Sequence, residues 1–177
     1  ASQAAVLRTA AALRTAGVRV VDVDLPQSFG ALAEHQRVVM RHEGRSTFLA
    51  MARRHGADLH ADFHEHVANA DGYTRAQVRA ATDAIAAARP VFDDIAAGYD
   101  ALLTPLAVGE APVGEATGDP IFQRMWTALH VPAMALPGHR GPNGLPIGLQ
   151  LVAPRWHDAE LVSVAAAIEP IVVRAGA

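Results

Sequence analysis

The densest group of potential ligand residues is His60, Asp62, His64 and His66. Neutral imidazole and carboxylate groups bind divalent metal ions, and His60 and His64 would share one face of a helix at i, i+4. A catalytic zinc helix of this spacing carries a general-base glutamate directly after its first histidine, whereas this chain has Ala61 there. We therefore interpret the cluster as part of a solvated loop and expect no metal ion or other cofactor. A metalloenzyme is the alternative, and stoichiometric zinc in the purified chain would reveal it.

Nucleophilic catalysis has few candidate residues. All 15 basic residues are arginine and there is no cysteine, so lysine Schiff bases, lysine general bases, P-loops and thiolate nucleophiles are excluded from this chain. The serines are far apart in sequence, and none lies in a Gly-x-Ser-x-Gly elbow: Ser2, Ser28, Ser46 and Ser163. Glu110, Glu115 and Asp119 occupy a Gly/Pro-rich segment, where carboxylates more often keep a loop hydrated than transfer protons.

The composition is that of one folded domain. Apolar residues make up 51% of the 177 residues, charged residues 19%, and the net charge is −3. A chain with this balance can bury a core, and it lacks the positive field that nucleic acids or anionic membranes attract. No apolar run approaches the ~18 residues of a transmembrane helix, so we expect a cytoplasmic protein with no nucleic-acid or membrane partner.

Hydrophobic periodicity and Gly/Pro placement predict an α/β fold. Thr74 is expected to cap a helix that Pro90 kinks or divides, and Ser28 to cap a helix interrupted near Gly44. The expected helices are 3–16, 28–54, 74–97, 121–129 and 158–169, and Asp158 is expected to cap the last of them. The expected strands are 18–23, 99–105, 131–137 and 146–152, with a hairpin turn at Asn143-Gly144 between the last two. The expected loops are 55–73, which includes one turn, and 107–120.

One ordered set of segments goes beyond fold class. It comprises Asp100-Ala-Leu-Leu-Thr-Pro105, a Gly/Pro loop, Pro132-Ala133, Leu136-Pro137-Gly138, and Leu145-Pro-Ile-Gly-Leu-Gln150. Physically, these are short buried strands with prolines at their ends, as found around pockets. The set resembles the C-terminal portion of the amidase signature family, with its Asp-x-Leu-x-Thr-Pro and Leu-Pro-x-Gly-x-Gln patterns. The resemblance also includes Gly17 to Pro26 and covers nearly the whole chain.

The resemblance implies a mixed β-sheet flanked by helices and hydrolysis of amide carbon–nitrogen bonds by a Ser, cis-Ser, Lys triad. Those catalytic residues belong to the earlier part of the family's sequence, so no catalytic residue is assigned here. Residues 1–177 are expected to be a single segment from the later part of a longer product, and to be inactive alone. Its partners would be a small-molecule amide and the N-terminal amidase portion, and a homo-oligomer is compatible with the resemblance. The expected pocket wall is formed by Thr104, Leu106, Phe122 and Trp126. Core packing is the alternative role for all four.

The chain departs from the family pattern in two places. Thr127 and His130 stand where the family often has Asn and Gly before Pro-Ala, which alters the expected pocket. The aromatic-Asp-Gly stretch that the tRNA-dependent amidotransferases of the family usually carry near 53–56 is missing, which favours plain amide hydrolysis. A non-catalytic binding module derived from the same fold is the second hypothesis.

Overall fold

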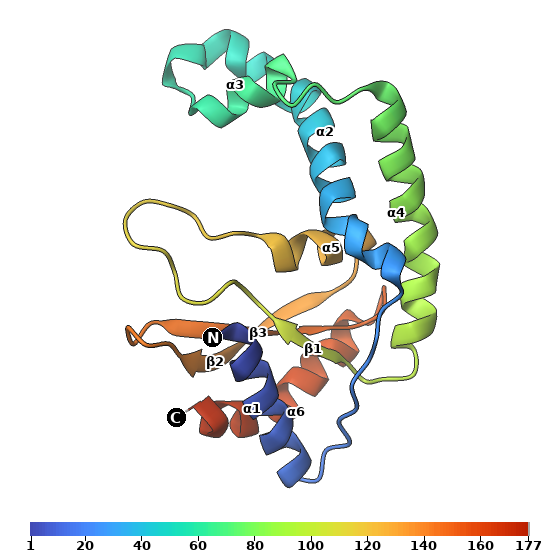
Figure 1. Ribbon diagram of the computed structural model, residues 1–177, viewed down its shortest axis with the longest axis vertical. Helices are drawn as coiled ribbons and strands as arrows, with labels where there is room; N and C mark the ends of the chain where they lie inside the picture. Colours follow the sequence, from blue (N-terminus) through green and yellow to red (C-terminus); the bar gives the residue numbers. More distant parts are fainter. Residues whose placement is uncertain (177) are drawn as a thin grey trace.

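The computed structural model describes residues 1–176, in which helices surround a small sheet (Figure 1). In chain order the elements are α1 (Ser2–Thr15), η1 (Gln27–Ala31), α2 (Leu32–His55), η2 (Gly56–Asp58), α3 (Ala61–Ala68), α4 (Arg75–Ala96), β1 (Leu102–Pro105), α5 (Ile121–Leu129), β2 (Ala133–Arg140), β3 (Pro146–Val152) and α6 (Asp158–Gly176), where η marks a 3-10 helix.

The sheet has the order β1-β3-β2, and both neighbouring pairs are antiparallel. β3 is the central strand, which explains its nearly unbroken apolar sequence. Its pairing with β1 aligns Leu102 with Val152, and its pairing with β2 contains an irregularity between Leu136 and His139. The predicted hairpin turn is confirmed, and Gly144 adopts a φ of 79° there, a conformation that glycine reaches without steric cost.

Two hydrophobic clusters lie on the opposite faces of the sheet because side chains alternate along a strand. Val152 and Leu102 contribute to the cluster formed with α2, α4 and α5. Ile147, Leu149 and Leu151 contribute to the cluster formed with α1 and α6. The α/β class expected from the sequence is thus confirmed, with helices covering both faces of an antiparallel sheet.

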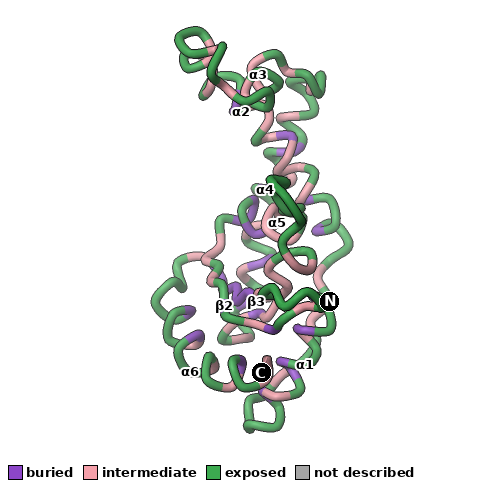
Figure 2. The backbone as a smooth tube through the Cα atoms, turned by 90° about the vertical axis from the view of Figure 1, so that its left-hand side faces the viewer, coloured by how far each residue is buried: buried purple, intermediate pink, exposed green. Residues whose placement is uncertain are grey.

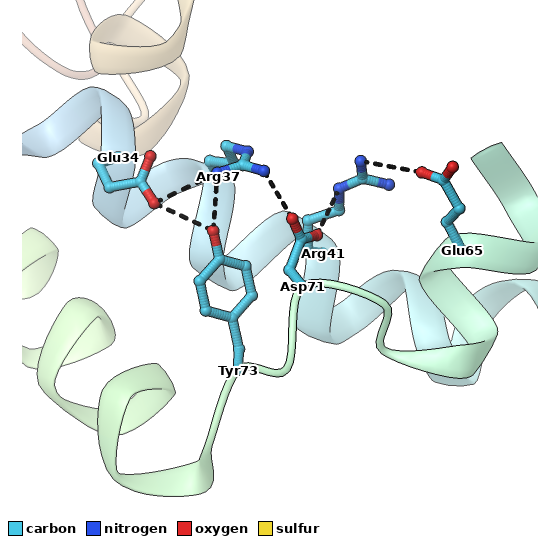
Figure 3. Close-up of polar contacts among 6 residues, drawn as sticks. All are labelled: Glu34, Arg37, Arg41, Glu65, Asp71 and Tyr73. Atoms are coloured by element: carbon cyan, nitrogen blue, oxygen red, sulfur yellow. Dashed lines mark hydrogen bonds and ion pairs between the residues drawn. The ribbon is translucent and has the colours of Figure 1, made fainter.

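Helices α2, α3 and α4 project from this body as a helical arm with a largely exposed tip (Figures 1 and 2). Polar contacts connect α2 with the segment after α3 (Figure 3). The Asp71 carboxylate accepts from Arg37 at 2.6 Å and pairs with Arg41 at 3.0 Å, while the Tyr73 hydroxyl donates to Glu34 at 3.0 Å. Partly exposed ion pairs of this kind contribute about 0–1 kcal/mol each, so they orient the arm more than they stabilise it.

Several predicted elements are confirmed, and their local signals explain why. α4 begins with a capping box in which Thr74 accepts from the Gln77 backbone and the Gln77 side chain accepts from Thr74 N–H. Helix α5 has the predicted bounds, and 107–120 contains no helix or strand. Pro90 does not divide α4.

Four predictions about the N-terminal half are wrong. Residues 18–23 are not a strand, because no other strand within residues 1–176 pairs with them. Ser28 lies inside η1 and caps no helix. α2 continues through Gly44, whose missing side chain leaves room for the His66 ring. Residues 61–68 form α3 rather than a loop, with the His60 side chain accepting from Asp62 N–H at its start.

Three further elements have bounds that differ from the prediction. β2 spans Ala133–Arg140 rather than 131–137, because its pairing with β3 runs from Ala133 opposite Val152 to Arg140 opposite Pro146. β1 begins at Leu102 rather than at Tyr99, because pairing with β3 begins at Val152. α6 extends past the predicted end at Glu169 and contains Pro170, with Val172 fully buried against the sheet. Packing of this last turn outweighs the hydrogen bond that proline removes.

Candidate functional site

A cavity of about 860 Å³ lies against β1, between α1, α5, α6 and the extended segment 18–25. Apolar side chains from five parts of the chain dominate its wall, including Val6, Leu13, Leu25, Phe122 and Ile168. Its volume falls within the range of small-molecule pockets, about 300–1,000 Å³. Such a wall can hold the apolar part of a ligand and keep water away from it.

One edge of β1 borders this cavity. β1 pairs with β3 on its other side, and within residues 1–176 no strand pairs with the edge that faces away from β3. An unpaired strand edge presents backbone donors and acceptors that can pair with a further strand. The cavity therefore combines an apolar wall with an open sheet edge.

Three of the four predicted pocket residues meet at this cavity: Thr104, Phe122 and Trp126. Phe122 is half-buried, and the Thr104 hydroxyl lies 3.5 Å from Gln150 O. Trp126 is only 5% exposed and packs against Phe92 with a ring-centroid distance of 5.5 Å, so it also belongs to the core.

Leu106 does not line the cavity and packs instead against Gly148. Its carbonyl accepts from the Gln123 side chain, which ties the end of β1 to α5. This contact fixes the helix that carries Phe122 relative to the strand that carries Thr104. The segment 18–25 and Tyr99 also line the cavity, although the sequence does not mark them as site residues. The β-branched composition of 18–23 predicts a strand, whereas the segment forms an extended cavity wall in which Val18 and Val21 stay exposed.

The polar groups of the cavity wall are few: Arg19, Asp22, Tyr99, Asp100 and Thr104. Among the described lining residues there is no serine, lysine or histidine. The wall therefore offers binding and orientation, and it provides no pair of a nucleophile and a base.

The predicted ligand cluster, His60, Asp62, His64 and His66, lies at the start of α3 and along it, and its side chains do not converge on one point. His64 Nε2 lies 2.8 Å from Gly56 O, and the His66 ring packs edge-on against Phe48 at 5.5 Å. Within residues 1–176, no three His, Cys, Asp or Glu side chains are placed to share a metal ion.

Two of the three loop carboxylates, Glu110 and Asp119, have structural partners. Glu110 accepts from the backbone N–H groups of Asn143 and Leu145, each at 3.0 Å, and from the Asn143 side chain at 2.7 Å. It therefore fastens the 107–120 loop to the β2–β3 turn. Asp119 accepts from Ile121 N–H at the start of α5.

His139 forms a buried polar contact beneath the sheet, with its Nε2 2.9 Å from the Thr9 hydroxyl. Burial, followed by the nearby Arg8 charge, lowers the pKa of His139 below its usual value of 6.5. The unfolded chain therefore binds a proton here more tightly than the folded chain. The stability from neutral His139 is fully present above about pH 6.5 and is lost as pH falls towards the folded-state pKa.

We expect the free energy of unfolding to decrease between about pH 7.5 and pH 5.5, as measured by urea denaturation at each pH. His139→Gln should reduce this decrease. The variant should keep part of the decrease in the free energy of unfolding, because burial, followed by the charge of Arg89, also lowers the pKa of His130. An unchanged pH dependence in His139→Gln would contradict the assignment.

The chain is similar in sequence and fold to known proteins. A family model described as Amidase matches residues 1–162. The chain is 41% identical over 86 residues to the A subunit of glutamyl-tRNA(Gln) amidotransferase from Roseobacter denitrificans, covering 44% of this chain and 17% of that protein. It is 27% identical over 188 residues to the corresponding protein of Halobacterium salinarum, covering 89% of this chain and 44% of that protein.

A solved structure described as an amidase superposes with a TM-score of 0.81 at 22% identity, covering 96% of this chain and 42% of that one, which shows a common fold. The chain spans less than half the length of each of these three proteins. Within residues 1–176, no helix is long and apolar enough to cross a membrane.

Proposed function

Because the match covers residues 1–162, the chain belongs to the amidase family, and we propose that it forms one wall of the substrate pocket of an enzyme that hydrolyses amide carbon–nitrogen bonds. The observation that carries this proposal is the cavity beside β1. There, Thr104, Phe122 and Trp126 converge next to an edge of β1 that no strand of the described residues pairs with. An apolar wall binds the acyl part of an amide and limits the access of bulk water to the carbonyl.

The chemical step requires a nucleophile and a base that the described wall does not contain. Since the chain has no lysine, the proposed triad lies outside residues 1–177, and these residues alone are inactive. The N-terminal amidase portion is the proposed partner that supplies the triad, and a further strand of that portion would pair with the open edge of β1. We propose plain amide hydrolysis, because the aromatic-Asp-Gly stretch expected for transamidation is missing near residues 53–56. The proposed location is the cytoplasm.

A first test is to read the coding sequence upstream of Ala1. An in-frame lysine followed by a Gly/Ser-rich segment with a serine pair supports the proposal. A stop codon directly before residue 1 would contradict it and favour a binding module.

The kinetic test uses the product of the complete reading frame that contains residues 1–177. Phe122→Ala should raise KM about tenfold for a linear aliphatic amide such as hexanamide, because a half-buried aromatic wall residue contributes about 1–2 kcal/mol of apolar contact. Val113→Ala is the matched control, because Val113 is fully exposed in the 107–120 loop.

The dependence of the loss on acyl chain length, together with thermal stability, distinguishes a pocket residue from a core residue. A pocket role predicts a loss that grows with acyl chain length from acetamide to hexanamide, with unchanged thermal stability. Equal losses on both amides together with a lower melting temperature would assign Phe122 to the core and contradict the proposed wall, as would the absence of amide hydrolysis.

A further inference from the structure

A second cavity, of about 520 Å³, lies on the opposite side of α5 from the first, between α2, α4 and the C-terminal end of α5. Its apolar wall includes Val39, Phe48, Ile85 and Ala128. Its charged lining residues are Glu43 from α2 and Arg89 from α4, with His130 beside Arg89. Uncharged polar residues line it as well, among them Gln36, His66 and Thr127, so its polar groups come from α2, α3, α4 and the C-terminal end of α5.

Arg89 is held in place at this cavity. Its Nε donates to Ala128 O at 3.1 Å, and its Nη2 lies 2.9 Å from His130 Nε2. His130 ends α5 in the left-handed conformation, with a φ of 58° that is uncommon for a residue other than glycine. A neutral His130 ring accepts from the guanidinium and so orients it. The lowered pKa of His130, which burial and then the Arg89 charge cause, is consistent with that role.

The two charges of this cavity have no counter-charge in the part of the chain that the structure describes. Among residues 1–176, no carboxylate lies within 4 Å of the Arg89 guanidinium and no cation lies within that distance of the Glu43 carboxylate. The neighbouring Arg155 differs in this respect, because Asp93 pairs with it at 2.6 Å. A guanidinium that already makes two hydrogen bonds and still has free N–H groups is suited to a carboxylate.

Each single-charge ligand would meet an unfavourable neighbour here. A carboxylate on Arg89 would be repelled by Glu43, and an ammonium on Glu43 would be repelled by Arg89. A ligand that carries both charges satisfies both groups. We propose that this cavity binds a small zwitterion on an apolar frame, with its carboxylate on Arg89 and its ammonium on Glu43.

Isothermal titration calorimetry on the product of the complete reading frame tests this proposal without any turnover of amides. The probes share five carbons: 2-aminopentanoate, 5-aminopentanoate, pentanoate and pentylamine. At least one of the two amino acids should bind about tenfold more tightly than both single-charge probes. The better of the two amino acids shows how far apart the bound charges lie. Equal affinity for all probes, or no binding by either amino acid, would overturn the proposal.

Two variants locate the binding. Glu43→Gln, an isosteric change at an exposed position, should weaken amino-acid binding about tenfold, with Glu169→Gln on α6 as its control. Arg89→Gln should weaken it at least as much, with Arg79→Gln on the same helix as its control. If Arg89→Gln fails to fold, Glu43→Gln alone decides, and unchanged affinity in Glu43→Gln overturns the assignment.

Discussion

Replacing Phe92 by alanine should lower the free energy of unfolding by about 3–5 kcal/mol, the range typical of a buried phenylalanine. Phe92 is completely buried. Its ring lies 5.5 Å from the ring of Trp126 and 6.5 Å from that of Phe29, measured between centroids. It therefore joins α4, α5 and η1 in one cluster above the sheet.

The loss should lie at the upper end of that range because the surroundings cannot close around the cavity. Pro90 fixes one backbone dihedral two residues earlier, and Asp93 is held by Arg155, whose backbone N–H and Nε lie 3.1 and 2.8 Å from its carboxylate oxygens. The removed ring thus leaves an unfilled space as well as lost apolar contact.

Urea denaturation monitored by circular dichroism measures this change, with Val91→Ala as the matched control. Val91 is the preceding residue of the same helix and is 42% exposed, so its variant should change stability by less than about 0.5–1 kcal/mol. Similar losses for the two variants would show that Phe92 does not hold the cluster together.

The sequence is sufficient for elements whose signals are local. A cap at Thr74 and the helical spacing of Ala81, Ile85 and Phe92 predict α4. Thr74 caps the helix and the three apolar residues are buried, and the structure adds Gln77 as the second partner of a capping box. The Asn143-Gly144 sequence predicts the hairpin because its signal is local. The structure forms the reversal as a five-residue loop, 141–145, in which Gly144 N–H donates to Gly141 O at 3.0 Å.

The errors fall where distant residues decide. The run 18–23 has strand composition, but a strand also needs a partner, and its backbone is instead extended along the cavity. The sequence does not predict α3, because it is short and its ends lack the usual signals: a histidine caps its start, and an asparagine in the left-handed conformation ends it.

The two cavities also differ in how much of each can be predicted from the sequence. Thr104 and Phe122 are predicted as pocket residues from the resemblance, and the structure brings them together at one cavity. Arg89 gives no signal in the sequence, because its position opposite Glu43 depends on how α4 packs against α2 and α5. The lack of a counter-charge at Arg89 can be recognised only in the folded structure, where the neighbours of each side chain are known.

Gly138→Ala should destabilise the fold by about 2–3 kcal/mol, although it adds only one methyl group. Gly138 lies in β2 at the irregularity between Leu136 and His139. A Cβ atom there would overlap the carbonyl oxygen of Ile147 on β3. Backbone atoms of the central strand cannot rotate away, so the two strands must separate and weaken the pairing that buries His139 against Thr9.

Two other glycines make this prediction specific to the backbone contact. Gly148→Ala meets the Leu106 side chain, which can change rotamer, and should cost less than Gly138→Ala. A Cβ atom at Gly30 meets nothing within 4 Å, so Gly30→Ala should change stability by at most about 1 kcal/mol. Thermal and urea unfolding of the three variants should therefore rank Gly138 as most sensitive, Gly148 next and Gly30 least. A Gly138→Ala protein as stable as Gly30→Ala would mean that β2 and β3 do not approach as closely in solution as the structure places them.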